Sequence, residues 1–104
     1  ELRNHTIETA GILNKAGVPM CICTDHPVVP EQYLPLSAGL AVRGGLDRDE
    51  ALKAITIYPA QITGIADRVG SIEVGKDADI VIFSGDPLSV CDTPDMVIVN
   101  GTVI

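Results

Sequence analysis

Residues 17–27 read GVPMCICTDHP, and this stretch decides the fold predicted for the chain. Its centre, Val18–Thr24, is a short, continuously apolar run with β-branched members, as in a strand buried on both faces of a parallel sheet. Apolar residues recur at helical spacing over residues 3–16, and Gly17 is the expected C-cap of that helix. Helix, short loop and buried strand form an αβ unit, the repeating element of α/β folds.

Helices are also predicted in the stretch that follows this strand. A proline-rich loop runs to Pro35, and residues 36–42 follow it as a helix. Asp47 and Glu50 have the spacing of a capping box, in which Asp47 accepts from a backbone N–H and Glu50 reaches back. Pro59 is expected to open one more short helix. The helix after Asp47 is expected to turn four side chains toward the core, namely Ala51, Leu52, Ile55 and Tyr58.

The pattern changes from helical to β near Gly64. We therefore predict two regions, residues 1–64 with α/β character and residues 65–104 with antiparallel β character. The dipeptide Asn100-Gly101 is the strongest two-residue hairpin signal in the chain. The predicted strands cover residues 69–74, 78–84, 96–99 and 102–104.

Composition excludes several classes of function. The chain has 104 residues, 46% of them hydrophobic, and a mean hydropathy of +0.31, so it is not a disordered acidic tail. A net charge of −7 disfavours binding to a phosphate backbone, and we expect no nucleic-acid partner. No apolar run is long enough to span a membrane. The cysteines number 3, which does not suit a disulfide scaffold, and a reducing cytoplasm is the simplest compartment.

Asp25 is the first candidate for chemistry, because it stands just beyond the carboxyl end of the predicted strand. In α/β sheets and barrels, catalytic and metal-binding groups collect at that edge. A carboxylate there can bind a divalent metal or take a proton from a metal-bound water. The alternative is that Asp25 only caps the following turn through a local hydrogen bond.

The two histidines differ in what they can do. His26, next to Asp25, could orient that carboxylate, contact a substrate or bind a metal as neutral imidazole. Alternatively, His26 is a loop histidine without a partner. His5 stands at the start of a predicted helix and is expected to be a solvated surface residue.

The cysteines offer a second hypothesis for metal binding. Cys21 and Cys23 alternate along the predicted strand, so both side chains point to one face. A metal site would group them with Asp25 and His26, but the spacing is not C-x-x-C, and one strand cannot wrap a tetrahedral site alone. Small, buried, apolar thiols are the favoured interpretation of this pair. Cys91 falls in a polar loop and is expected to be an ordinary loop residue.

Four parts of the chain together resemble one family. GVPMCICTDHP resembles the last strand of a barrel with its terminal Asp25, and GSIEVGKDADIVIFSGDP, from Gly70, resembles the re-entry into a small β domain. The GSIE-x-GKDAD part of that string is highly specific. The chain thus resembles the C-terminal end of the metal-dependent amidohydrolase superfamily, within its imidazolonepropionase-like branch. The remaining matches are residues 38–46 with 49–60, which resemble the helices after that strand, and 97–103, which resemble a terminal hairpin.

The resemblance implies an α/β fold, in which this chain is the last αβ/α portion of a (β/α)8 TIM-type barrel. The C-terminal strands of a small composite β-sandwich domain would follow. It also implies divalent metal, with zinc as the expected ion and Asp25 as a ligand that accepts the proton of the attacking water and returns it to the leaving nitrogen. We assign His26 to substrate binding as a hypothesis. Tyr58 departs from the pattern, because relatives commonly have Asn at that position before Pro-Ala.

The resemblance also indicates that much of the parent fold lies outside this sequence. A complete barrel needs roughly 250 residues, and the family's other metal ligands lie on strands that are absent here. The first hypothesis is therefore a fragment of a cytoplasmic amidohydrolase that hydrolyses a C–N bond of a small cyclic amide or related molecule, inactive by itself. The second is a non-catalytic interaction module derived from the barrel, whose exposed barrel faces and strand edges predict self-association.

Overall fold

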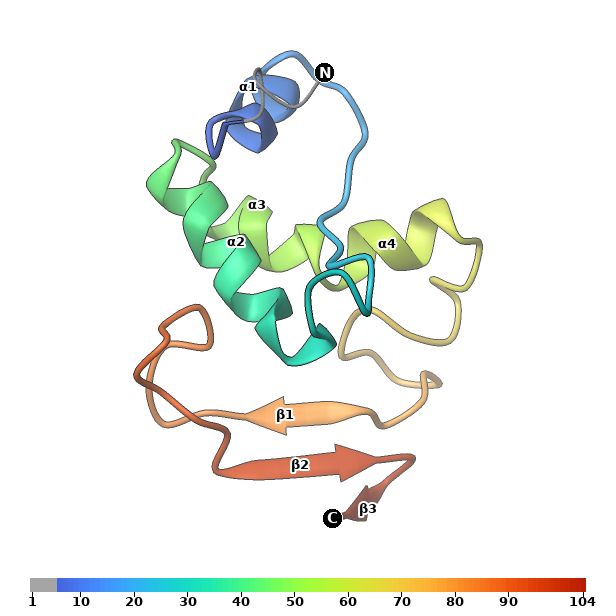
Figure 1. Ribbon diagram of the computed structural model, residues 1–104. Helices are drawn as coiled ribbons and strands as arrows, with labels where there is room; N and C mark the ends of the chain where they lie inside the picture. Colours follow the sequence, from blue (N-terminus) through green and yellow to red (C-terminus); the bar gives the residue numbers. More distant parts are fainter. Residues whose placement is uncertain (1–5) are drawn as a thin grey trace.

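The computed structural model describes residues 6–104 as a group of short helices followed by a small sheet. In Figure 1 the helices lie together on one side and the three strands on the other, with β1 nearest the helices. No helix in the described part of the chain is long and apolar enough to cross a membrane. The elements in chain order are α1 (Thr9–Lys15), the 3-10 helix η2 (Glu31–Tyr33), α2 (Leu34–Arg43), α3 (Arg48–Ala54), α4 (Ile57–Ile62), β1 (Ile80–Ile82), β2 (Met96–Val99) and β3 (Thr102–Val103).

Local sequence chemistry explains where the helices begin. Asp47 is the N-cap of α3, and its carboxylate accepts from the backbone N–H groups of Asp49 and Glu50. Pro35 lies in the first turn of α2, where a missing N–H costs nothing because those groups have no partner within the helix. Pro59 lies inside the first turn of α4 rather than opening it, which the same reasoning permits.

The core is small and lies among the helices. Its buried members are mostly alanines, whose small side chains let the helix backbones approach closely. Leu88 joins this core from the loop after β1, and a Cβ built on Gly39 of α2 would lie 2.7 Å from the Leu88 carbonyl oxygen. Only a glycine at position 39 therefore allows that loop to pack on α2. The core cluster consists of Ala38, Ala41, Leu46, Ala51 and Leu88.

The stretch predicted as a buried strand, Val18–Thr24, is extended but is not a strand in this structure, so that prediction is wrong as stated. Two of its amides donate to neighbouring helices: Val18 to the carbonyl oxygen of Leu13 in α1, and Ile22 to that of Ala54 at the end of α3, both at 3.0 Å. Within residues 6–104, the amides of Met20, Cys21 and Cys23 donate no hydrogen bond. A strand exists only when a second strand pairs with it, and the described residues supply none here.

The sheet has the order β1-β2-β3, and both pairings are antiparallel. Ile80 is opposite Ile98 in the first pairing, and Val99 is opposite Thr102 in the second. The Asn100-Gly101 turn between β2 and β3 is confirmed, and both of its residues have positive φ. The strand predicted over residues 69–74 is wrong, since that stretch forms turns and bends.

The cause of that error lies in the surroundings of residues 69–74. Gly70 adopts a φ of +94°, which turns the chain out of an extended course. The apolar side chains of Ile72 and Val74 are exposed, so packing against other described residues does not stabilise an extended conformation here. The helices lie within residues 9–62 and the strands within residues 80–103, while the boundary near Gly64 stays a prediction.

Candidate functional site

Asp25 lies where the extended segment ends. Its φ is +54°, in the left-handed region that aspartate tolerates better than most residues, and its side chain is exposed. The following turn is closed by the backbone, because the Val28 amide donates to the Asp25 carbonyl oxygen at 2.8 Å. Within residues 6–104, the Asp25 carboxylate makes no hydrogen bond or ion pair. No side-chain hydrogen bond in the described residues supports the alternative in which this carboxylate only caps the turn.

His26 is also exposed, and one of its ring nitrogens is already used. The backbone amide of Glu31 donates to His26 Nδ1 at 3.3 Å, where η2 begins. An Nδ1 that accepts leaves Nε2 as the nitrogen that can contact another molecule. His26 therefore has one ring nitrogen in a hydrogen bond and one that is free, next in sequence to the unengaged carboxylate of Asp25.

The described residues do not form a complete metal site. No group of three or more His, Cys, Asp or Glu side chains gathers anywhere in the part of the chain that the structure describes. The thiols of Cys21, Cys23 and Cys91 are free, which leaves no support for the grouping of cysteines with Asp25 and His26. Cys23 is exposed rather than buried, because nothing in the described chain covers that face of the segment. His5 lies outside the described residues.

A second cluster, centred on Glu50 of α3, was not predicted as a tertiary contact. Two donors reach its Oε2 atom, the Tyr58 hydroxyl of α4 at 2.6 Å and Asn14 Nδ2 of α1 at 3.1 Å. Lys53 Nζ lies 3.0 Å from the other oxygen, Oε1. Glu50 therefore does not reach back to complete the predicted capping box. Its carboxylate instead joins three helices, which we call the Glu50 cluster (Asn14, Glu50, Lys53 and Tyr58).

The contacts of the Glu50 cluster shift the acidities of its members. The Tyr58 hydroxyl, followed by Lys53, stabilises the carboxylate and lowers the pKa of Glu50. The same hydrogen bond favours the protonated phenol and raises the pKa of Tyr58. The pKa of Lys53 is raised chiefly by its hydrogen bond to Glu50. All three shifts favour the observed pairing of an anionic Glu50 with a neutral Tyr58 and a cationic Lys53.

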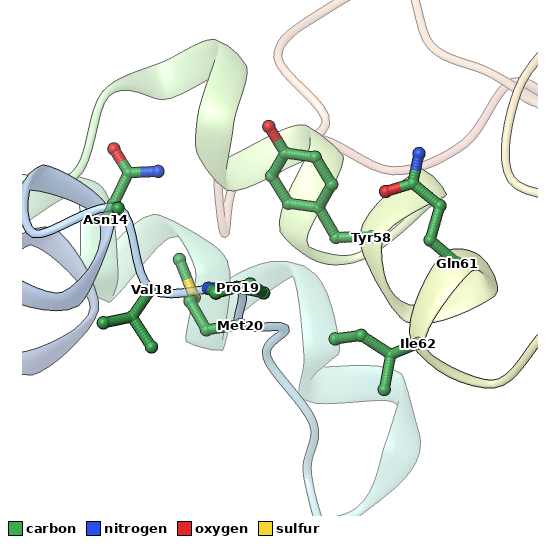
Figure 2. A pocket seen from close by; sticks show the side chains of 8 residues that line it. Asn14, Val18, Pro19, Met20, Tyr58, Gln61 and Ile62 are labelled. Carbon is green, nitrogen blue, oxygen red and sulfur yellow. The ribbon is translucent and has the colours of Figure 1, made fainter.

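A hollow of about 290 Å³ opens beside the Glu50 cluster (Figure 2). Figure 2 shows Tyr58, Gln61 and Ile62 reaching it from α4, and Asn14 at the end of α1. The start of the extended segment forms its remaining wall. Asp25 lies at the other end of that segment, so this hollow is not the place where Asp25 acts. Its full lining is Asn14, Gly17, Val18, Pro19, Met20, Tyr58, Gln61 and Ile62.

Comparisons with known proteins place the chain in a family. The model of the family described as "Amidohydrolase family" matches residues 1–104. The chain is 41% identical over 70 residues to the imidazolonepropionase of Thermoplasma acidophilum, which covers 65% of this chain and 17% of that protein. The chain spans 9% of the length of the amidohydrolase tasK of Hapsidospora irregularis and 21% of that of the imidazolonepropionase of Cupriavidus necator.

Solved structures agree with this placement. The amidohydrolase from Thermotoga maritima superposes with a TM-score of 0.93 at 40% identity, over 99% of this chain and 27% of that one. The structure described as a putative prolidase from Bifidobacterium longum has a TM-score of 0.80 at 31% identity, over 94% of this chain and 26% of that one. Both the matched family and the shared fold lead to one conclusion: this chain belongs to the amidohydrolase family.

Proposed function

We propose that this chain is the part of a metal-dependent amidohydrolase that carries Asp25, and that the whole enzyme hydrolyses a C–N bond in a small cyclic amide. The observation that carries the proposal is the exposed Asp25 carboxylate, which ends the extended segment and makes no bond within residues 6–104. The likeness to an imidazolonepropionase supports the class of substrate. The reaction belongs to the whole protein, and the chain alone is expected to be inactive.

The described residues can supply one ligand to a divalent metal ion, the carboxylate of Asp25. A hydrolytic zinc ion takes about three protein ligands, whereas the described residues bring no three candidate ligands together. Asp25 would supply one oxygen ligand to a divalent metal, for which we propose zinc, and residues outside this chain would supply the others. When bound, such an ion acts as a Lewis acid and makes water more acidic.

Within that arrangement, Asp25 moves the proton. Its free carboxylate oxygen takes a proton from the attacking water and returns it to the leaving nitrogen, so one side chain serves as base and then as acid. His26 binds the small-molecule substrate through Nε2, because its Nδ1 is held by the Glu31 amide. This assignment gives the two neighbouring residues different tasks.

A second candidate substrate is a dipeptide that ends in proline. The favouring observation is the fold shared with a structure described as a putative prolidase, at 31% identity. We prefer the cyclic amide because the imidazolonepropionase likeness holds at 41% identity. Both substrates present an amide carbon to the same chemistry, so the choice between them rests on a direct assay.

The test uses the full-length protein, loaded with zinc, and compares Asp25→Asn with Asp67→Asn. Asp67 is an exposed carboxylate that makes no hydrogen bond among the described residues, so it controls for loss of one surface charge. Asp25→Asn should lower kcat for a five-membered cyclic amide by about 10²- to 10⁴-fold and lower the bound zinc measured by mass spectrometry. Full activity in Asp25→Asn would overturn the proposal. If the enzyme hydrolyses Xaa-Pro dipeptides and not the cyclic amide, the proposed substrate class is wrong and the dipeptide takes its place.

The alternative to an enzyme part is an interaction module, and the exposed apolar side chains support it. Val28, Ile72, Val74 and Ile104 are all largely exposed, and the edge of the extended segment has unpaired amides. We propose that the isolated chain associates with itself through these surfaces, despite the mutual repulsion of chains with a net charge of −7. Light scattering across a concentration series tests this, and a monomer at the highest concentration would contradict it. We further propose a cytoplasmic location, and we expect neither a nucleic-acid partner nor a membrane partner, since the net charge is −7.

A further inference from the structure

Two contacts with α3 hold the segment that leads to Asp25. Before the segment starts, Asn14 Nδ2 donates to Glu50, 3.1 Å away. In its middle, the Ile22 amide donates to the Ala54 carbonyl oxygen at 3.0 Å. Glu50 and Ala54 are one helical turn apart, about 6 Å along the axis of α3. The chain between Asn14 and Ile22 is therefore attached at both ends to one short, rigid helix.

The first of these attachments depends on Tyr58. Its hydroxyl and Asn14 Nδ2 donate to the same oxygen, Glu50 Oε2, while Lys53 lies on Oε1. With both oxygens engaged, the carboxylate has one favoured orientation, and that orientation presents Oε2 to α1. Without the hydroxyl, rotation of the Glu50 side chain is opposed only by its bonds to Asn14 and to the half-exposed Lys53.

Packing supports the segment on one side only, where Met20 and Ile22 lie against the helical core. The hollow of about 290 Å³ lies against the start of the segment, so Val18, Pro19 and Met20 lack close neighbours on that side (Figure 2). The backbone hydrogen bonds from Val18 to Leu13 and from Ile22 to Ala54 remain, but the side of the segment toward the hollow is open, so the segment can still shift along α3. Asp25 is three residues beyond Ile22, and it would move with such a shift.

We propose that Asn14, Glu50 and Tyr58 are positioning residues, which act at the far end of the extended segment to fix the place of Asp25. This inference rests on the proposed function of Asp25. The three side chains touch neither substrate nor metal, and they act through the segment between α1 and Asp25. Their role differs from general stability because it concerns one segment and not the whole fold.

The test compares Tyr58→Phe with Gln61→Ala in the full-length protein. Tyr58→Phe removes one hydroxyl and keeps the ring, whereas Gln61 lines the same hollow and donates to no side chain in the cluster. We expect Tyr58→Phe to lower kcat by about 10- to 100-fold with little change in KM, since a small misplacement of a reacting group is costly. Hydrogen exchange of a peptide covering residues 18–24 should become faster, while exchange in β2 stays unchanged. Gln61→Ala should change neither.

The outcomes separate this inference from the proposed function. Equal kcat and exchange in Tyr58→Phe and Gln61→Ala would overturn the positioning role, and so would faster exchange with an unchanged kcat. Equal acceleration of exchange in residues 18–24 and in β2 would also overturn it, since that is a loss of general stability. If Asp25→Asn keeps full activity, the proposed function fails, whatever Tyr58→Phe does. If Asp25→Asn is inactive and kcat falls in Tyr58→Phe but not in Gln61→Ala, the result supports both the proposed function and the positioning role.

Discussion

Replacement of Leu88 by alanine should detach the loop after β1 from the helical core. Leu88 is 9% exposed and is, among the described residues, the one buried core member that lies beyond α4. Leucine-to-alanine changes at buried sites cost about 2–5 kcal/mol, from the lost transfer of apolar atoms and the void left behind. A loop can partly collapse into that void, so we expect a loss of about 2–3 kcal/mol, or roughly 30- to 150-fold in the folding equilibrium.

The assay is urea unfolding followed by circular dichroism, at a concentration where light scattering shows a single species. Val90→Ala is the matched control, since Val90 belongs to the same loop and is 72% exposed. That control should lie within about 0.5 kcal/mol of the parent chain. A loss for Leu88→Ala that does not exceed the loss for Val90→Ala would show that Leu88 does not join the loop to the helices, and the described core would then be wrong.

Two further predictions concern the Glu50 cluster and the hairpin. The fold lowers the pKa of Glu50 from its ordinary value of 4.5. The ionised Glu50 therefore contributes its full stabilisation above pH 4.5, and this stabilisation is lost as the pH falls through the lower pKa of the folded state. Glu50→Gln should therefore be less sensitive to acid than the parent chain between about pH 5 and pH 3, as measured by urea midpoints; an identical acid dependence would contradict the cluster. Gly101→Ala places a side chain at a φ of +79° and should lower the stability of the turn by about 1 kcal/mol, whereas Asn100→Asp should be tolerated. Hydrogen exchange of the amides in β2 is the measurement: it should become faster in Gly101→Ala and stay unchanged in Asn100→Asp.

The sequence predicted best those elements that depend on neighbouring residues. Asp47 begins α3 because its own carboxylate accepts the nearby amides, and Asn100-Gly101 turns the chain because both residues tolerate positive φ. Residues 18–24 form an apolar run, and residues 69–74 carry Val69, Ile72 and Val74, but a strand also needs a partner that the local sequence does not reveal. Both predictions failed because no strand pairs with these residues in the described chain, and Gly70 also turns the second stretch out of an extended course.

The candidate site divides in the same way. Asp25 could be singled out from the sequence because it follows an apolar run, which is a local signal. The family match covers both this run and Asp25. The Glu50 cluster could not be singled out, because Asn14 is 36 positions away from Glu50 in the sequence. Glu50 was interpreted as a local cap and Tyr58 as a core residue, since the spacing of each had a simpler explanation. Asn14 did not stand out on its own helix either, because α1 also carries the polar residues Thr9 and Lys15.

The sheet presents branched apolar side chains on both of its faces. Ile80 and Ile82 share one face and Val81 lies on the other, and these side chains are all partly or largely exposed. A slip by one residue therefore exchanges one set of apolar side chains for another, and burial does not penalise it. The alignment is instead fixed at the turn, where the Asn100 amide donates to the Asp79 carboxylate at 2.8 Å and the Gly101 amide to the Ala78 carbonyl at 3.0 Å. Polar contacts at one end of the sheet therefore set the register of its strands.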